Sequence, residues 1–178
     1  TRASKAREKG LEPLAKILLA QEETTLAPEE VAAPFVDEEK GVKNAKEALQ
    51  GAMDIIAEII ADDADYTARL RELTFEGGMF ECEAVDPDES TVYDMYYGKV
   101  EAIKTVPNHR ILAMNRGEKE KKLKIKVKAP VERIHQYLGE ELIGLKSSVF
   151  TALLEATIED AYKRLMAPSI EREIRNQL

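Results

Sequence analysis

Apolar residues recur every three or four positions along most of this chain, which is the period of an amphipathic α-helix. The clearest apolar stripe lies between Gly41 and the pair Asp62-Asp63, and it predicts one helix with a single buried face. Towards the C-terminus the pattern is interrupted at Pro168, which we expect to open a new helix because proline suits the first helical turn. The same period predicts further helices at Leu11–Gln21, Pro28–Phe35, Tyr66–Leu73, Pro107–Arg116, Val131–Leu138 and Val149–Leu165.

Two short segments follow the period-two alternation of a half-buried strand instead. Between residues 122 and 128, lysines alternate with leucine, isoleucine and valine, and between residues 80 and 84 two glutamates alternate with apolar residues. An acidic strand beside a lysine strand would form favourable cross-strand pairs, so we expect the two to pair. The pattern as a whole predicts a mainly α fold, an elongated multi-helix assembly with a small two-stranded β element.

The predicted elements divide the chain into three consecutive segments. Residues 1–74 form a helical segment, residues 75–130 a mixed segment with short strands and one helix, and residues 131–178 a segment of long helices. At both ends of the chain the helical pattern is open, because it has neither a clear start signal at Thr1 nor a stop signal before Leu178. We therefore expect a piece of a longer protein.

Composition excludes several classes of protein. The 178 residues carry a formal net charge of −8, whereas a free-standing nucleic-acid binder is usually strongly basic. One cysteine and two histidines exclude a disulfide framework and an ordinary Cys/His zinc site. No apolar run approaches the roughly 20 residues that span a bilayer. We expect a soluble, cytoplasmic protein with no membrane segment, no cofactor and no bound metal.

Lysines are concentrated in one segment, which can be interpreted in two ways. The side chains could line a nucleic-acid backbone, because cations that neutralise phosphates release counterions and strengthen binding. Alternatively they could form the solvated face of an edge strand, where lysines prevent strand-to-strand aggregation. The candidate contacts are Lys119, Lys121, Lys122, Lys124, Lys126 and Lys128, with Arg2, Lys5 and Arg7 as further cations near the N-terminus.

A second polar cluster contains Pro107, His109, Arg110, Arg116 and Gly117. A histidine changes charge near neutral pH, but general acid–base catalysis also needs a partner and a substrate pocket, and the sequence offers neither. The structural interpretation is that the proline opens a helix, the histidine and Arg110 hydrogen-bond to neighbouring segments, and the glycine ends the helix.

Other candidate chemistry is weak. Asp62, Asp63 and Asp65 could gather a hard cation such as Mg²⁺, although closely spaced aspartates after a helix are more often a polar terminus and cap. Cys82 has no local signature of a catalytic thiol. None of the common phosphate-binding, metalloprotease or serine-hydrolase motifs occurs in the sequence. We therefore expect no enzyme activity.

Six segments spread along the chain carry a more specific pattern, and they are Arg7–Ala15, Phe35–Val42, Ala48–Glu58, Met95–Tyr97, Pro107–Glu118 and Ile170–Arg175. In this order they resemble the Tex-type bacterial transcription accessory proteins. The resemblance implies a fragment of the N-terminal half of such a protein, from the end of its helical region up to an RNase-H-like domain of the YqgF type. It also implies that the main nucleic-acid contact is an oligonucleotide-binding barrel further along the longer protein. It offers no catalytic residue at these positions.

Two functional hypotheses follow. In the first, the fragment is a non-catalytic helical scaffold that positions nucleic-acid-binding domains and adds a minor contact through its basic residues. RNA or DNA would then be bound through the full-length protein. In the second, the acidic helical surface docks onto the transcription machinery without touching nucleic acid. The sequence leaves the oligomeric state open.

Overall fold

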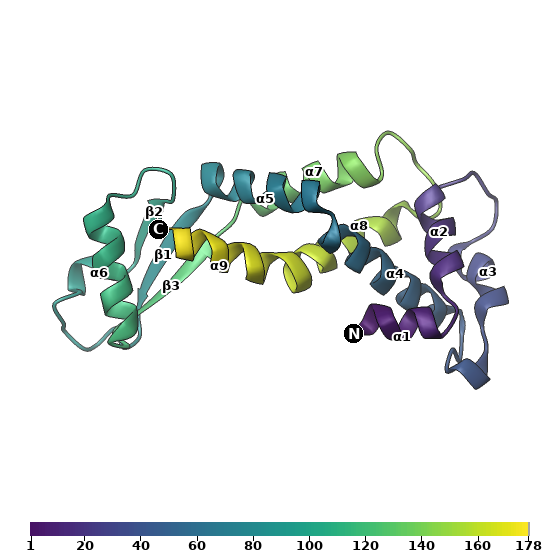
Figure 1. The fold of residues 1–178 in the computed structure, drawn as a ribbon, viewed down its shortest axis with the longest axis horizontal. Helices are drawn as coiled ribbons and strands as arrows, with labels where there is room; N and C mark the ends of the chain where they lie inside the picture. The colour runs from purple at the N-terminus through teal and green to yellow at the C-terminus, as the bar shows by residue number, and fades with distance from the viewer. Residues whose placement is uncertain (178) are drawn as a thin grey trace. The chain divides into compact units, whose positions relative to one another are not determined.

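The computed structural model describes residues 1–177 and confirms the mainly α fold with a small antiparallel sheet (Figure 1). The chain forms two compact units. The first contains Thr1–Thr67 and His135–Ser169, and the second contains Ala68–Ile134 and Ile170–Leu178. Within residues 1–177, no helix is both long enough and apolar enough to cross a membrane. The division into three consecutive segments stays a prediction.

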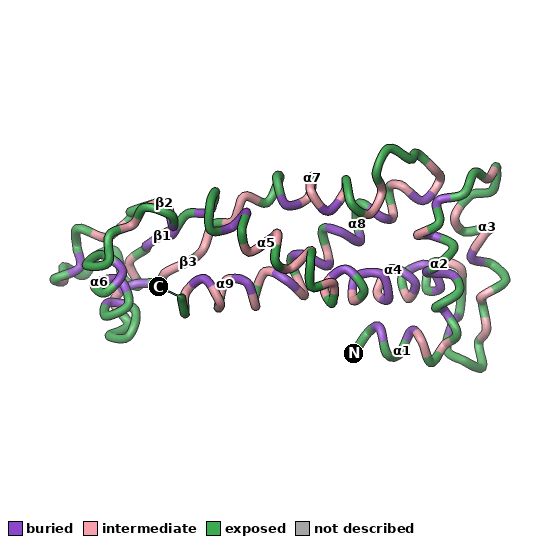
Figure 2. The backbone as a smooth tube through the Cα atoms, turned by 45° about the horizontal axis from the view of Figure 1, so that its top comes forward, coloured by how far each residue is buried: buried purple, intermediate pink, exposed green. Residues whose placement is uncertain are grey.

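The first unit is built around the long helix α4 (Ala45–Asp62). Its start is fixed by Asn44, whose side-chain oxygen accepts a hydrogen bond of 2.9 Å from the backbone N–H of Glu47, as an N-cap does. Most of the apolar residues of α4 are buried, and buried segments recur along this helix in Figure 2. Against it pack α1 (Arg2–Glu8), α2 (Glu12–Ala20), α3 (Pro28–Ala32) and α8 (Thr151–Asp160).

The N-terminal residues differ in one respect from the open helical pattern of the sequence. The structure forms two helices, α1 and α2, separated by Gly10 with a φ of +76°. A left-handed backbone is accessible to glycine at no steric cost, so the chain turns there instead of continuing one helix. Ala3 and Ala6 face α4 with only 3% of their surface exposed, and these small side chains let α1 lie close to α4.

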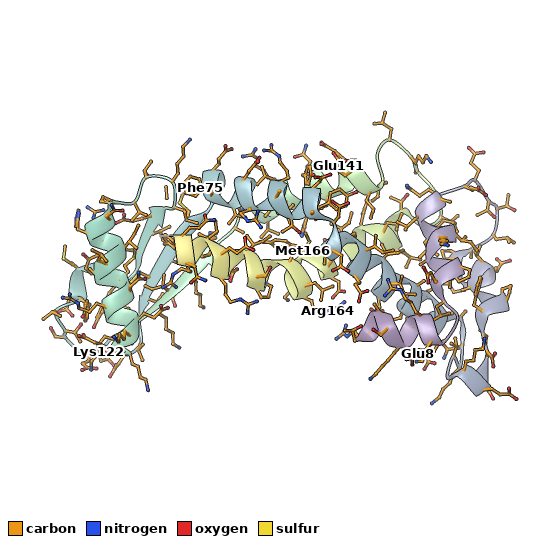
Figure 3. All side chains as sticks on the ribbon, in the orientation of Figure 1. Glu8, Phe75, Lys122, Glu141, Arg164 and Met166 are labelled. Carbon is orange, nitrogen blue, oxygen red and sulfur yellow. The ribbon has the colours of Figure 1, made fainter. Side chains whose placement is uncertain are left out.

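Pro168 was expected to interrupt a helix and open a new one, and this prediction is wrong in part. The helical path continues from α8 through a π-helical segment, Ala161–Met166, directly into α9 (Ala167–Gln177). In this wider turn the backbone N–H of Ala167 bonds to the carbonyl of Tyr162. Because proline has no N–H and its ring crowds the preceding turn, the widened segment lets the chain pass it without a break. Arg164 and Met166 lie on this segment (Figure 3).

The second unit contains a three-stranded antiparallel sheet in the order β2-β1-β3. Its strands are β1 (Met79–Ala84), β2 (Lys99–Ala102) and β3 (Leu123–Lys128). The predicted pairing of the acidic strand with the lysine strand is confirmed, with Glu81 opposite Lys126 and Glu83 opposite Lys124. The sequence did not predict β2, which adds a third strand to the expected pair.

Helix α6 (Asn108–Lys119) packs against β3, as Figure 1 shows. Gly117 was expected to end this helix, and that prediction is wrong. The helix continues for two more residues, and the left-handed position is taken by Lys121, with a φ of +62°. The N–H of Lys122 bonds to the carbonyl of Gly117 and that of Lys121 to Glu118, the hydrogen-bond pattern of a Schellman motif. Gly117 is needed for close packing instead, because a Cβ there would overlap the side chain of Leu123.

Ion pairs join the remaining helices of the second unit to its other elements. Arg175 on α9 donates to Glu118 on α6 over 2.6 Å, and Arg71 on α5 (Ala64–Gly77) pairs with Glu173 on α9. Helix α7 (Val131–Leu142) follows β3 and contributes its larger part to the first unit.

Candidate nucleic-acid interface

The lysines of β3 lie on one face of the sheet. Because side chains alternate along a strand, Lys124, Lys126 and Lys128 share the face opposite to the one that α6 covers. All three are exposed, whereas Leu123 and Cys82 on the covered face are buried, with 2% and 1% of their surface accessible. The sequence-based prediction of a half-buried lysine strand therefore matches the geometry.

This lysine row faces glutamates on the neighbouring strand. Glu81 and Glu83 of β1 stand on the same face, opposite Lys126 and Lys124. The carboxylate of Glu81 is also 3.9 Å from the ammonium nitrogen of Lys128. Opposite charges this close attract each other and lower the positive potential that a phosphate would meet. The row of three lysines is thus partly neutralised by its own sheet.

The other three lysines of the segment lie at the turn between α6 and β3. Lys119 and Lys121 are exposed, and Lys122 is half-buried. Lys122 pairs with Glu89 over 2.6 Å, and this hydrogen bond raises the pKa of the Lys122 ammonium above its ordinary value. Figure 3 labels Lys122 at this end of the second unit. The Lys122 ammonium therefore holds the segment that follows β1 at the turn between α6 and β3.

The cations of α1 belong to the first unit. Arg7 pairs with Glu58 of α4 over 2.6 Å, and the hydrogen bond with that carboxylate raises the pKa of the Arg7 guanidinium. Arg2 and Lys5 instead point to a different side of the helix, where they line a groove of about 430 Å³ between α1 and the start of α4. We call this the basic groove, and its four cationic side chains are Arg2, Lys5, Lys9 and Lys43.

Sequence reasoning missed two of those four cations. Lys9 could have been found, because Arg2, Lys5 and Lys9 follow the helical spacing of three and four residues that places side chains on one face. Lys43 could not, because it lies before α4 and reaches the groove only through the packing of α1 on that helix.

The motif around Pro107 forms the start and end of α6. Pro107 occupies the N-cap position, and Arg110 pairs with Glu101 of β2 over 2.5 Å. His109 and Arg116 are exposed, and Gly117 is buried beneath Leu123. The contacts of Arg110 and Gly117 fasten α6 to the sheet.

The structure shows the surroundings of the aspartates and the cysteine that were considered for metal binding and thiol chemistry. The side chain of Asp63 accepts a hydrogen bond of 2.9 Å from the N–H of Tyr66, which makes it a cap at the start of α5. Among residues 1–177, no group of three or more histidine, cysteine, aspartate or glutamate side chains is arranged to hold a metal. Burial raises the pKa of the Cys82 thiol to about 11, so it is almost entirely protonated and unreactive at neutral pH.

Comparison with known proteins defines the family. A family model described as Tex central region-like matches residues 23–178, which is most of the chain. The chain belongs to the Tex family. It is 44% identical over its whole length to the uncharacterized protein YdcI of Bacillus subtilis, and 38% identical over 71% of its length to protein tex of Bordetella pertussis. It covers 25% and 16% of these two relatives, respectively.

A more distant relative is itself named for RNA binding. The chain is 27% identical, over its whole length, to a protein of Pongo abelii named S1 RNA-binding domain-containing protein 1, of which it covers 19%. A Neisseria gonorrhoeae relative, 29% identical, is named transcriptional accessory protein Tex. The Tex central region matched here includes Lys43 and the lysines of β3, and the YdcI match extends over α1 as well.

Proposed function

We propose that this chain is a non-catalytic helical scaffold within a Tex-family protein that binds nucleic acid and assists transcription. The observation that carries the proposal is that ion pairs join separate elements within each unit. Three arginines bind carboxylates that are far away in the sequence, and so they hold the chain's own elements together.

Three ion pairs form these connections. Arg7 on α1 is held by Glu58 on α4, Arg71 on α5 by Glu173 on α9, and Arg175 on α9 by Glu118 on α6. Each pair joins two elements separated by more than fifty residues. A segment that fixes helices in this way suits a supporting role better than a catalytic one, for which a pocket with convergent reactive groups is expected.

The partner follows from the names of the relatives. Proteins named as transcription accessory and RNA-binding support association of the longer protein with RNA, and DNA is the other candidate. Under this proposal, domains outside the chain make the main contact. The lysine row of β3 contributes little, because glutamates of β1 share its face.

The experiment measures fluorescence anisotropy of a labelled single-stranded RNA and a duplex DNA with this chain, at about 50 and 200 mM salt, where multi-phosphate contacts lose most affinity. The triple variant Lys122→Glu/Lys124→Glu/Lys126→Glu should bind within twofold of the unchanged chain. The same RNA, incubated with the chain and Mg²⁺, should remain intact. A loss of binding in the triple variant, or cleavage of the RNA, would contradict the scaffold role.

A second candidate function is supported by the segment between β1 and β2. Val92 and Met95 expose 85% and 67% of their surface there, and Asp86, Asp88 and Asp94 accompany them. Large apolar side chains that are exposed together are typical of a protein-docking site. If this segment docks onto the transcription machinery, purified RNA polymerase should bind the unchanged chain more tightly than a Val92→Ser/Met95→Ser variant. Equal binding would contradict this second function.

A further inference from the structure

Within the described residues, the four cations of the basic groove form no ion pair that joins two elements of the fold. In this they differ from Arg7, Arg71 and Arg175. The volume of the groove is about 430 Å³, within the range of small-molecule binding clefts. One bank is α1 and the other is the segment leading into α4, with the buried side chains of Leu11 and Val42 forming part of the floor. Figure 2 shows α1 lying along α4 at this place.

Three cations of the groove form a row along α1. Arg2 and Lys5 lie on α1 and Lys9 is its C-cap, and their spacing of three and four residues places them on one side of the helix. Seven residues at 1.5 Å each give a row about 10 Å long, which is roughly the rise of three stacked nucleotides. Arg7, which lies between them in the sequence, projects to another side and pairs with Glu58. The row is therefore a property of the helix face and not of the segment's overall composition.

The fourth cation reaches the groove from the opposite bank. Lys43 lines the groove from the segment before α4. That segment also contains Gly41, with a φ of +88°, and a side chain at Gly41 would lie 3.5 Å from the Cε atom of Lys9. The side chain of Lys9 therefore lies next to this turn, near the bank from which Lys43 reaches the groove.

The two acidic side chains of the groove are occupied by neutral donors. Glu47 accepts a hydrogen bond of 2.9 Å from the backbone N–H of Lys43, as part of the capping of α4. Asp54 accepts one of 2.9 Å from the side-chain amide of Gln50, and it also interacts electrostatically with Arg164. The two carboxylates are thus held at the start and the flank of α4. The groove keeps an excess of two positive charges in a chain whose net charge is −8.

We propose that the basic groove binds the phosphodiester backbone of a single-stranded nucleic acid, with the row along α1 contacting successive phosphates and Lys43 a further one. This goes beyond the scaffold role, because it gives the chain a nucleic-acid contact of its own. The choice of a nucleic acid as the ligand rests on the proposed association of the longer protein with RNA or DNA. The shape and the charge of the groove are observed independently of that proposal. Four contacts on a single strand correspond to a salt slope of about −3, or a roughly 50-fold loss of affinity between about 50 and 200 mM salt.

The experiment compares two double variants of this chain that each change the charge by four units. Lys5→Glu/Lys9→Glu removes two cations of the groove, and Lys16→Glu/Lys46→Glu changes two exposed lysines of the same unit that lie outside it. Anisotropy with a 12-nucleotide RNA and a DNA of the same sequence should show a loss of affinity on the order of tenfold in the groove variant only, with a salt slope shallower by about 1.4. The milder Lys5→Gln/Lys9→Gln variant should show the same change of slope without a reversal of charge.

Several outcomes would overturn the proposal. Absence of binding at low salt, or equal losses in the two charge-reversed variants, would show that no local contact exists at the groove. If a poly-glutamate peptide displaced the RNA from the groove at the same concentration as unlabelled RNA, an acidic protein segment would be the occupant. Thermal unfolding by circular dichroism shows whether each variant is folded. None of these outcomes touches the scaffold role, which is read from the lysines of β3 and from the cleavage assay.

Discussion

The two basic regions of this chain look alike in the sequence and differ in what surrounds them. On β3, three lysines alternate along a strand and face Glu81 and Glu83 of the neighbouring strand. On the groove side of α1, the cations follow the helical period, and the two acidic groups that line the groove, Glu47 and Asp54, accept hydrogen bonds from neutral donors instead. The denser lysine segment is therefore the weaker candidate for a phosphate contact. The position of counter-charges in space, rather than the density of lysines in the sequence, sets the local potential.

The largest expected effect is on the stability of the first unit, in which α4 lines the basic groove. Ile56 is fully buried in α4, and Ile59 in the same helix exposes 43% of its surface. Truncation of a buried isoleucine typically costs about 2–5 kcal/mol, from lost burial and the cavity left behind. We expect Ile56→Ala to lower the free energy of unfolding by this amount in urea, and Ile59→Ala to change it by about 1 kcal/mol or less. Equal losses in the two variants would mean that the apolar stripe of α4 is not the support of the first unit.

A somewhat smaller effect tests the support of the lysine row. A Cβ added at Gly117 would collide with the Cγ and Cδ1 atoms of Leu123, whereas one added at Gly139 in α7 meets open space. Overpacking of this kind costs about 1–3 kcal/mol, so Gly117→Ala should reduce stability although alanine favours helices. Gly139→Ala should instead raise stability by up to about 1 kcal/mol. Urea unfolding of both variants checks the difference in sign, and a stabilised Gly117→Ala variant would contradict the packing described for α6 and β3.

The sequence predicted those elements whose pattern reflects one buried face. The stripe of α4 and the alternation on β1 and β3 are both visible in the sequence because each follows a single period over several residues. Strand β2 escaped prediction, since Lys99–Ala102 is only four residues long and its Val100 is exposed. Pro168 misled the prediction because a π-helical segment before it relieves the clash that normally breaks a helix.

The candidate site was predictable only where one element carries it. The row of Arg2 and Lys5 on α1 follows from helical spacing, and so would Lys9. The groove itself was not predictable, because Lys43 and Gly41 join it through the packing of α1 on α4. Likewise, the glutamates that face the β3 lysines were expected from the proposed pairing, but only the register shows which lysines they oppose.

The comparison can be sharpened by removing the counter-charges of the lysine row. In the Glu81→Gln/Glu83→Gln variant, the lysines of β3 would face neutral amides of nearly the same size. If the glutamates are what weakens this face, the variant should bind single-stranded RNA more tightly than the unchanged chain, with a salt slope steeper by up to about 2 for three new phosphate contacts. Anisotropy at several salt concentrations measures the slope. An unchanged slope would show that the lysine row cannot follow a phosphate backbone even when it is free of acidic neighbours.

The smallest effect separates two cations on the same helix. Arg7 pairs with Glu58, and their side chains are 36% and 26% exposed, so solvent screens the pair and its loss in Arg7→Gln should cost at most about 1 kcal/mol. RNA affinity should stay unchanged, because Arg7 projects away from the basic groove. Lys5→Gln should do the opposite, with unchanged urea unfolding and a salt slope for RNA binding shallower by about 0.7. If Arg7→Gln weakened RNA binding as much as Lys5→Gln, the charge of α1 as a whole, and not the face that borders the groove, would attract the nucleic acid.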